Sequence, residues 1–340
     1  MSEARPLLEI KDLSVHFEVY GGQLKVLDGV NFYMQAGEKV GLVGESGCGK
    51  TTTMKAILRV LPGSTARISR GQIHFDGQDI MKIKEDEMVQ VRGGGISMIF
   101  QDPTAALNPV FSIGEQLELV IKHSALPGKS ISKKEIHQRA VNALEEVALA
   151  DPERLLKSYP VQLSGGMRQR VCIGMALATN PKLLIADEPG TSLDVTIQDQ
   201  VLRLLHRLVE DHNTSVILIS HTLGIVRQIT NRVYVMYAGT MVETAPTEQL
   251  FANPLHPYTQ GLISTIPRLT GGGISSGIPG SISDYRNPPT GCRFHPRCTH
   301  AMEICLKEKP PHFQVDKKHS VACFLYQPEV SSAPVETRLQ

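Results

Sequence analysis

The sequence lacks the features that mark secreted, membrane-spanning and nucleic-acid-binding proteins. No apolar run approaches the roughly 18 residues that a transmembrane helix requires. The N-terminus, MSEARPLLEI, lacks the basic and then apolar layout of a signal peptide. The 35 basic residues nearly balance the 34 acidic ones, so the net charge of +1 gives no general attraction to nucleic acid or to an anionic membrane. These absences predict a cytosolic protein, and 340 residues suffice for one large domain or two modest ones.

Cysteine is scarce, and its distribution is uneven. Of six cysteines, Cys48 and Cys172 stand alone, whereas four gather near the end of the chain: Cys292, Cys298, Cys305 and Cys323. In a reducing compartment such a group indicates a metal site before it indicates disulfides. Zinc and an iron–sulfur cluster both accept four thiolates, and three nearby histidines offer substitute ligands: His295, His300 and His312. The residues alone leave the metal open and predict that it staples a small module with little apolar core.

The segment KVGLVGESGCGKTTT, residues 39–53, predicts a nucleoside triphosphate site. Val40–Val43 is typical of a strand buried on both faces, and Gly44 opens the pattern Gly-x4-Gly-Lys-Thr. Glycines let such a loop bend, so that successive backbone N–H groups converge on an anion at a helix N-terminus. Lys50 would reach the β- and γ-phosphates, and Thr51 would bind Mg²⁺ through its hydroxyl. The predicted nucleotide contacts are Gly44, Glu45, Ser46, Gly47, Cys48, Gly49, Lys50, Thr51 and Thr52.

Cys48 has two interpretations. It stands just before a helix N-terminus and two residues from Lys50, an environment that lowers the pKa of a thiol. On this interpretation the thiol is reactive in the apo protein and bound nucleotide protects it. On the other, Cys48 is only a small residue that fits the loop.

Two acidic residues follow a second buried strand. Residues 182–186, KLLIA, predict that strand, and Asp187 and Glu188 stand at its carboxyl end. An acidic residue in this position can hold Mg²⁺ through the ion's water shell, which is the role expected of Asp187. Glu188 is then placed to orient or deprotonate the attacking water. The alternative for the pair is a solvated turn.

Two further polar residues end buried strands. Gln101 follows the strand predicted at 96–100, and Pro103 prevents that strand from continuing. His221 follows the strand predicted at 216–220. Because ligands of open α/β sheets bind at the carboxyl ends of the strands, we expect both side chains near the phosphates. The alternatives are a turn role for the glutamine and a packing role for the histidine.

Residues 102–180 change character and predict a helical insertion in a mixed sheet. Ser112 with Glu115, and Ser132 with Glu135, predict two capping boxes. The segment LSGGM, residues 163–167, predicts a further helix start, with the serine as its cap and the glycines allowing close approach of an anion.

The N-terminal part predicts an antiparallel ribbon that feeds the central sheet. Apolar and polar residues alternate at 13–19 and again at 30–34. Phe17 or Tyr20 could stack on an adenine ring; alternatively, Phe17 packs inward and Tyr20 lies at a loop edge. The expected fold is α/β, with a mixed central sheet, an antiparallel β subdomain and the helical insertion.

In this order, these segments resemble those of ABC-transporter ATPase subunits over residues 7 to about 250. The resemblance implies an ABC-type P-loop ATPase that hydrolyses ATP with Mg²⁺. In that family the LSGG segment of one subunit closes over the ATP held by another. Ser164, Gly165 and Gly166 would make this contact, and Asp194 would lie at the subunit interface.

The same resemblance implies roles for the polar residues at the strand ends. Gln101 would sense Mg²⁺ and the membrane subunits. Glu188 would be the catalytic base, and His221 would be the switch histidine. The aromatic residue near the start, Phe17 or Tyr20, would stack on adenine.

The rest of the chain narrows the resemblance. Residues 253–259, NPLHPYT, and the terminal cysteines resemble the C-terminal extension of peptide and nickel importer ATPases. GESGCGKTTT and LSGGMRQRV also resemble the dipeptide and oligopeptide branch, which favours a [4Fe–4S] cluster on the four cysteines, with zinc as the alternative. The implied function is ATP-driven import of dipeptides or oligopeptides. The alternatives are a nickel importer ATPase and a soluble ABC ATPase acting on DNA or ribosomes.

The predicted organisation is a nucleotide-binding domain at 1–250, with its helical subdomain at about 102–180, and a C-terminal extension at 251–340. The extension holds the cysteine module at about 291–324, and Gly271–Gly273 predicts a flexible loop before it. The implied partners are two membrane permeases, a second cassette that is identical or homologous and, indirectly, an extracellular peptide-binding protein, with no nucleic acid. The implied location is cytoplasmic, on the inner face of the cell membrane.

Overall fold

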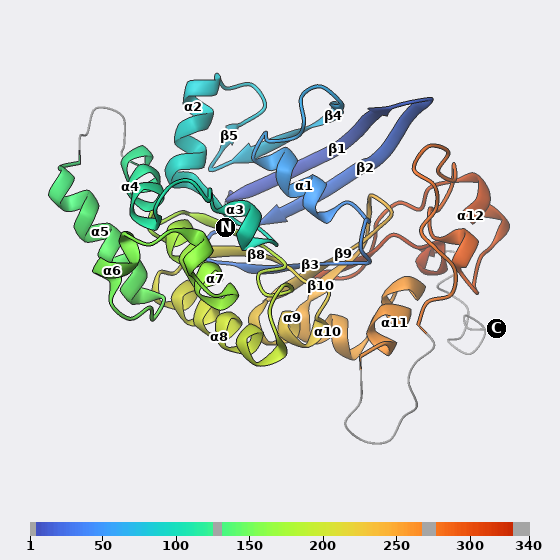
Figure 1. The fold of residues 1–340 in the computed structure, drawn as a ribbon. Coiled ribbons are helices and arrows are strands. Elements are labelled where there is room, and N and C mark those ends of the chain that lie inside the picture. Colours follow the sequence, from blue (N-terminus) through green and yellow to red (C-terminus); the bar gives the residue numbers. More distant parts are fainter. Residues whose placement is uncertain (1–4, 125–130, 267–276, 329–340) are drawn as a thin grey trace. The chain divides into compact units, whose positions relative to one another are not determined.

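The computed structural model describes residues 5–124, 131–266 and 277–328 (Figure 1). The chain divides into two compact units. The first contains residues 1–34, 40–81 and 220–340, and the second contains residues 35–39 and 82–219. The flexible loop predicted around Gly271–Gly273 lies outside the described residues. Over the described ranges, every helix is too short or too polar to cross a bilayer.

The first unit contains an antiparallel sheet, as the alternating N-terminal segments predict. Its strands are β1 (Leu8–Val19), β2 (Gly22–Met34), β4 (Ala66–Phe75) and β5 (Gln78–Asp79), in the order β2-β1-β4-β5. β1 turns back into β2 so that Val19 pairs with Gly22. The apolar residues of β1 are buried: Leu8, Ile10, Leu13 and Val15.

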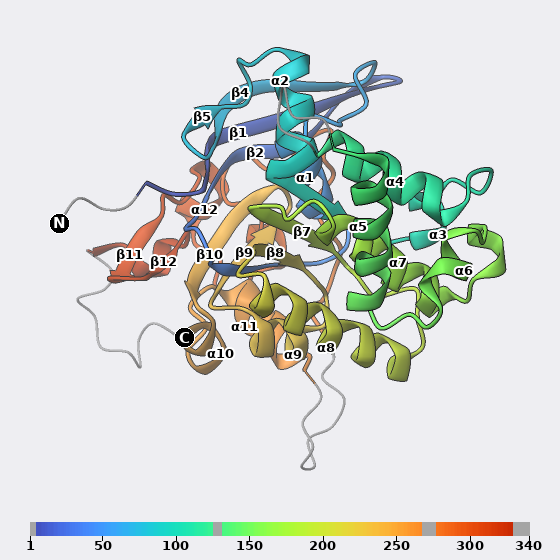
Figure 2. The same ribbon diagram turned by 90° about the vertical axis from the view of Figure 1, so that its left-hand side faces the viewer.

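A mixed sheet forms the rest of the first unit's framework. Its strands are β3 (Lys39–Val43), β9 (Arg232–Tyr237), β10 (Thr240–Pro246), β11 (Phe313–Asp316) and β12 (His319–Val321). β3 runs parallel to β9, and the other pairs, β9–β10, β10–β12 and β12–β11, are antiparallel. The C-terminal extension thus adds two strands beside β10, which Figure 2 shows at the orange and red end of the chain.

The helices of the first unit are short. They are α1 (Lys50–Ile57), α9 (Leu223–Ile229), α10 (Thr247–Ala252), α11 (Pro257–Ser264) and α12 (Glu303–Lys307), with two 3-10 turns, η3 (His295–Arg297) and η4 (Phe324–Tyr326). An aromatic cluster joins β9 and α11 to the cysteine module. The ring of Tyr237 lies 4.7 Å from that of Tyr258 and 5.0 Å from that of Phe294, between centroids. The extension therefore shares a core with the strands before it.

The second unit contains three parallel strands in the order β8-β7-β6. They are β6 (Ile96–Ile99), β7 (Leu183–Asp187) and β8 (Ser215–Ile219). Every residue of β7 and β8 is buried, which confirms the strands predicted from apolar runs. Gln101 lies just beyond β6, and Asp187 is the last residue of β7.

The helical insertion is also confirmed (Figure 1). The helices of this unit are α2 (Glu85–Gln90), α3 (Pro103–Ala106), α4 (Ile113–His123), α5 (Lys133–Glu146), α6 (Pro152–Leu156), α7 (Gly165–Leu177) and α8 (Val195–Asp211), with a π-helical turn η1 (Val91–Gly95) and a 3-10 turn η2 (Pro160–Gln162). Ser112 and Glu115 form both bonds of the predicted capping box. Ser132 forms one bond of the second box, accepting the N–H of Glu135 at 3.2 Å.

A buried polar cluster ties β10 to the extension. The buried carboxylate of Glu243 accepts the N–H groups of Leu255 and His256, both at 2.8 Å, and Nε2 of His319 at 2.7 Å. His256 caps α11, because its Nδ1 accepts the N–H of Tyr258 at 3.0 Å. Burial lowers the pKa of His256 to about 4, although the charge of Glu243 opposes this. The imidazole is therefore neutral at pH 7 and keeps its capping lone pair.

We predict that acid destabilises the first unit through His256. Between pH 6.5 and about pH 4 the unfolded chain binds a proton that the folded chain does not. The free energy of unfolding therefore falls as the pH falls, by about 3 kcal/mol across this window. His256→Asn keeps a capping acceptor and removes the titration. The measurement is the thermal midpoint, followed by circular dichroism, from about pH 7 to about pH 4.5.

The readout is the slope of the midpoint against pH, since the substitution also changes packing at every pH. Burial also lowers the pKa of His312, so a smaller slope of the same sign should remain in the variant. An equally steep slope in wild type and His256→Asn would contradict the assignment.

Candidate functional site

The phosphate loop joins β3 to α1 in the first unit, and two of its glycines are sterically required. Gly44 has φ +151°, and a Cβ there would lie 2.2 Å from the carbonyl oxygen of Met236. Gly49 has φ +110°, and a Cβ there would lie 2.7 Å from Cδ2 of Leu27. Both positions combine a backbone conformation that L side chains avoid with a neighbour that leaves no room. The loop can therefore lie close against β9 and β2.

Lys50 is folded back over the loop. Its side chain is buried, and Nζ donates to the carbonyl oxygens of Gly44 at 2.8 Å and Glu45 at 3.0 Å. Gly49 is the N-cap residue of α1 and, being a glycine, makes no side-chain hydrogen bond to the helix. A lysine over a glycine-rich loop that leads into a helix N-terminus is the arrangement used to bind phosphates. The nucleotide contacts predicted for all nine residues at positions 44–52 stay predictions.

Cys48 differs from its expected chemistry. Its side chain is completely buried, and its carbonyl oxygen accepts the N–H of Gly239 at 2.8 Å. Burial raises the pKa of the Cys48 thiol, and the nearby charge of Lys50 only partly offsets this. The expectation of a lowered pKa is therefore wrong, because burial of the side chain disfavours the thiolate. The simpler interpretation, a small residue that fits the loop, agrees with this burial.

The remaining predicted residues of the first unit are the two aromatics and His221. Tyr20 is fully exposed at the turn between β1 and β2, and Phe17 is half-buried in β1, opposite Leu24. His221 is exposed and immediately precedes Thr222, whose N–H donates to the hydroxyl of Ser220 at 3.0 Å. Adenine stacking and the contact of His221 with phosphate stay predictions.

In the second unit the structure brings Gln101 and Glu188 together. Nε2 of Gln101 donates to Oε2 of Glu188 at 2.9 Å. The hydroxyl of Thr191 donates to the same oxygen at 3.2 Å. Thr191 was not among the predicted site residues, although its place three residues after Glu188, in a Pro-Gly turn, was a usable signal. The carboxylate is thus oriented by an amide and a hydroxyl.

The backbone of Glu188 is strained. It has φ +48°, an uncommon value for a residue with a side chain. Three hydrogen bonds hold it there: its N–H donates to the carbonyl of Ile219 at 2.9 Å, and its own carbonyl accepts the N–H groups of Gly190 at 2.7 Å and Thr191 at 3.2 Å. Such strain persists only where the surroundings enforce it, and it gathers at functional sites. The adjacent Asp187 is buried at the end of β7.

The LSGGM segment forms a helix start, as predicted. The hydroxyl of Ser164 accepts the N–H of Met167 at 3.3 Å and caps α7. A Cβ on Gly166 would lie 2.8 Å from Cγ2 of Ile197, so α7 begins in close contact with α8. Asp194 caps α8 by accepting the N–H of Ile197 at 3.0 Å. The structure thus places Ser164, Gly165 and Gly166 beside the helix that Asp194 caps.

The four terminal cysteines are free thiols, and their charges act on one another's pKa values. Burial and the charges of Cys292, Cys298 and Cys305 raise the pKa of Cys323 to about 12. Backbone N–H groups donate to three of the sulfurs and oppose this rise in pKa: Phe294 and His295 to Cys292, His300 to Cys298, and Leu325 to Cys323. Across the part of the chain that the structure describes, no three His, Cys, Asp or Glu side chains are arranged to hold one metal ion.

Comparison with known proteins agrees with this geometry. The ABC transporter family matches residues 27–191, and the family of C-terminal regions of oligopeptide/dipeptide transporters matches residues 242–305. The oligopeptide transport ATP-binding protein OppD of Bacillus subtilis is 46% identical over 326 residues, which are 95% of this chain and 90% of that protein. The dipeptide transport ATP-binding protein DppD of Bacillus subtilis is 43% identical over 321 residues, 94% of each chain.

Solved structures show the same fold. The dimeric ATP-binding cassette MJ0796, bound to ADP and Pi in a post-hydrolysis state, superposes with a TM-score of 0.62 at 26% identity. The match covers 71% of this chain and 98% of that one. The predicted ABC-type α/β fold, with its mixed sheet and antiparallel subdomain, is therefore confirmed.

The burial of Cys48 predicts that maleimide modifies it slowly in the folded protein, both without nucleotide and with MgATP. A buried thiol with a raised pKa has neither the access nor the thiolate fraction that alkylation requires. Modification is mapped by mass spectrometry of peptides, with protein unfolded in urea as the fully reactive control. Rapid labelling of the apo protein that MgATP suppresses would restore the reactive-thiol interpretation.

Proposed function

This chain belongs to the family of ABC transporter ATP-binding subunits, and we propose that it hydrolyses MgATP to power the import of dipeptides or oligopeptides. One observation carries the proposal. A phosphate loop, an LSGG helix start and a strained, oriented glutamate occur in one chain with a C-terminal region of the oligopeptide/dipeptide transporter type. The relatives with that region are named for oligopeptide and dipeptide transport.

The residues divide the chemistry between binding and catalysis. Lys50 and the loop N–H groups would hold the phosphates, and Thr51 and Asp187 would hold Mg²⁺. Glu188 would act as the general base on the attacking water, with Gln101 and Thr191 orienting its carboxylate. His221 would contact the γ-phosphate. Either Phe17 or Tyr20 would stack on adenine.

A second cassette, identical or homologous, would complete each ATP site. Ser164 is exposed at the start of α7, so its helix N-terminus is accessible to a nucleotide held by another subunit. Asp194, exposed at the start of α8, would lie at the same interface. The match to a cassette whose structure is dimeric supports this arrangement.

Two membrane permeases would dock on the second unit. Large apolar side chains are exposed on both sides of Gln101 and just before the LSGGM segment: Phe100, Val110, Phe111, Tyr159 and Val161. Exposed apolar groups of this kind mark interaction surfaces. The protein would therefore act on the cytoplasmic face of the cell membrane, and an extracellular binding protein would deliver peptide to the permeases. Nucleic acid is not among the proposed partners.

We further propose that the four terminal cysteines hold a [4Fe–4S] cluster that staples the extension. The donor set fits, because the charges of four reduced thiols act on one another's pKa values and three of the thiols accept backbone N–H groups. Such hydrogen bonds stabilise thiolates, the form that binds iron. A single zinc ion is the alternative, because it accepts the same four thiolates.

Replacing the proposed base tests the catalytic assignment. In the transporter assembled with its permeases and a second cassette, peptide should stimulate ATP hydrolysis by the wild type. Glu188→Gln keeps the size of the side chain and loses the proton acceptor, so turnover should fall by roughly 10²–10⁴-fold while ATP affinity is retained. Near wild-type hydrolysis by this variant would remove Glu188 from the role. Stimulation by Ni²⁺ rather than by peptides would contradict the proposed cargo.

The metal content tests the cluster. Anaerobic purification should give brown protein with about four irons and four acid-labile sulfides per chain. Cys298→Ser or Cys305→Ser should release the iron and make the extension protease-sensitive, whereas Cys172→Ser in α7 should change neither. Colourless protein with one bound zinc would overturn the cluster and keep the staple. Metal-free protein with paired cysteines and a folded extension would overturn both.

A further inference from the structure

The backbone of the phosphate loop is held from outside by the C-terminal extension. The N–H of Glu45 donates to the hydroxyl of Tyr258 at 2.8 Å, and the hydroxyl of Tyr285 donates to the carbonyl oxygen of Gly47 at 2.7 Å. Both tyrosines come from residues beyond 250, and all four residues belong to the first unit. Each bond fixes a peptide group within the Gly-x4-Gly turn.

The strongest contact is made by Arg297. Its guanidinium binds the carboxylate of Glu45 through two parallel hydrogen bonds, from Nη1 at 2.7 Å and from Nη2 at 3.0 Å. The Arg297 side chain is 5% exposed and that of Glu45 is 30% exposed, so the pair is largely shielded from water. A bidentate pair of this kind carries geometry as well as charge.

Arg297 is itself immobilised. Nε donates to the carbonyl of Pro279 at 2.8 Å, and Nη2 donates to that of Ile278 at 3.0 Å. Its guanidinium also lies 5.7 Å from the centroid of the Tyr237 ring. Because the arginine is fixed on three sides, it can impose one position on the Glu45 side chain.

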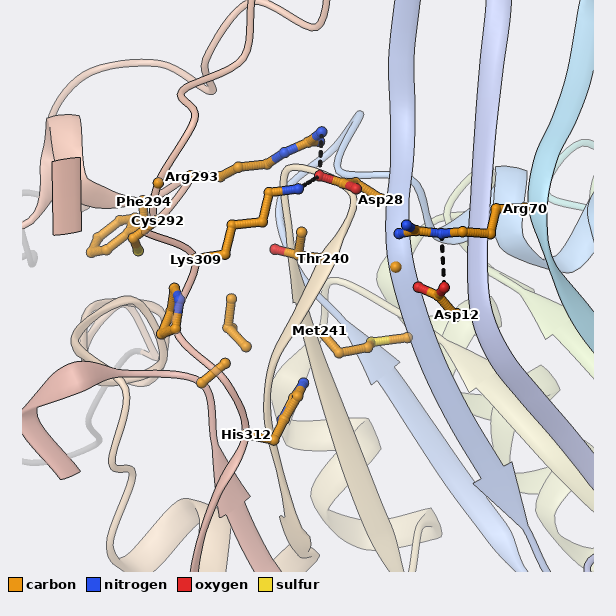
Figure 3. A pocket seen from close by; sticks show the side chains of 15 residues that line it. Asp12, Asp28, Arg70, Thr240, Met241, Cys292, Arg293, Phe294, Lys309 and His312 are labelled. Atoms are coloured by element: carbon orange, nitrogen blue, oxygen red, sulfur yellow. Dashed lines mark hydrogen bonds and ion pairs between the residues drawn. The ribbon is translucent and has the colours of Figure 1, made fainter. Parts of the chain in front are cut away.

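A second arginine anchors the same segment of the extension. Arg293 donates to the carboxylate of Asp28 on β2 at 3.2 Å and to the carbonyl of Ala238, in the turn between β9 and β10. Figure 3 shows Arg293 and Lys309 both directed at Asp28 across a pocket of about 250 Å³. The neighbouring Gly239 donates to the carbonyl of Cys48, so the contact of Arg293 with Ala238, unlike that of Lys309 with Asp28, also leads to the phosphate loop.

We propose that the C-terminal extension is a positioning part of the nucleotide site, in which Arg297 holds the phosphate loop through Glu45 with the help of Tyr258 and Tyr285. A glycine-rich loop samples many conformations, and a ligand's apparent affinity falls with the fraction that is competent to bind. The contacts with the extension raise this fraction before ATP arrives. Arg297 acts through Glu45 and is therefore a positioning residue.

The proposal rests on the loop being the ATP site, which binding of MgATP to the wild-type chain tests separately. Titration calorimetry on the full-length chain gives the Kd. Arg297→Gln and Glu45→Gln should each raise the Kd for MgATP about tenfold, as expected if the competent fraction drops to about a tenth. The double variant should be no weaker than either single variant, because both remove the same contact.

Two further variants separate positioning from general damage. Arg297→Lys keeps the positive charge but loses the guanidinium that makes two parallel hydrogen bonds. The Kd of this variant should therefore lie between those of the wild type and Arg297→Gln. Lys309→Gln removes the exposed partner of Asp28 from the same extension, and its Kd should equal that of the wild type. Glu45→Gln leaves the extension's own residues intact, so it keeps the test valid if Arg297→Gln disturbs folding.

An unchanged Kd in Glu45→Gln would overturn the proposal, as would additive effects of the two substitutions. An equal loss in Lys309→Gln would also overturn it, because damage anywhere in the extension would then suffice. Failure of the wild-type chain to bind MgATP would instead contradict the ATP site itself.

Discussion

The close approach of the phosphate loop to β9 is the constraint on which the first unit depends. Gly44 leaves only 2.2 Å between its missing Cβ and the carbonyl oxygen of Met236, so strand and loop lie in direct backbone contact. In the same region Gly239 donates to the carbonyl of Cys48, whose side chain is buried. Lys50 then finds its acceptors in the loop itself, at Gly44 and Glu45. These contacts of the protein with itself give the phosphate loop its shape.

The second unit shows how the carboxylate of Glu188 is held in place by its surroundings. Glu188 adopts a backbone conformation that costs of order 1–3 kcal/mol, and three backbone hydrogen bonds offset that cost. In this conformation one oxygen of the carboxylate accepts hydrogen bonds from both Gln101 and Thr191. The residues proposed to bind phosphate belong to the first unit, and the proposed base belongs to the second.

The extension is built into the first unit rather than appended to it. Its strands β11 and β12 extend the sheet beside β10, and the ring of Phe294 packs on those of Tyr237 and Tyr258. The carboxylate of Glu243, on β10, is buried and bonded to residues of the extension. A module this small has little apolar core of its own, so it gains stability from shared packing. Through Arg297 that shared structure reaches the nucleotide loop.

The sequence by itself determined the phosphate loop, the buried strands, the cap at Ser112 and the polar residues at the strand ends, because these follow from short-range periodicity and steric rules. It also indicated the family, through motifs in a fixed order. Only the tertiary structure decided that Cys48 is buried and that Thr191 orients Glu188. It alone paired Arg297 with Glu45, which lies 252 positions away. Burial and long-range pairing depend on which distant segments pack together, and no local pattern records that.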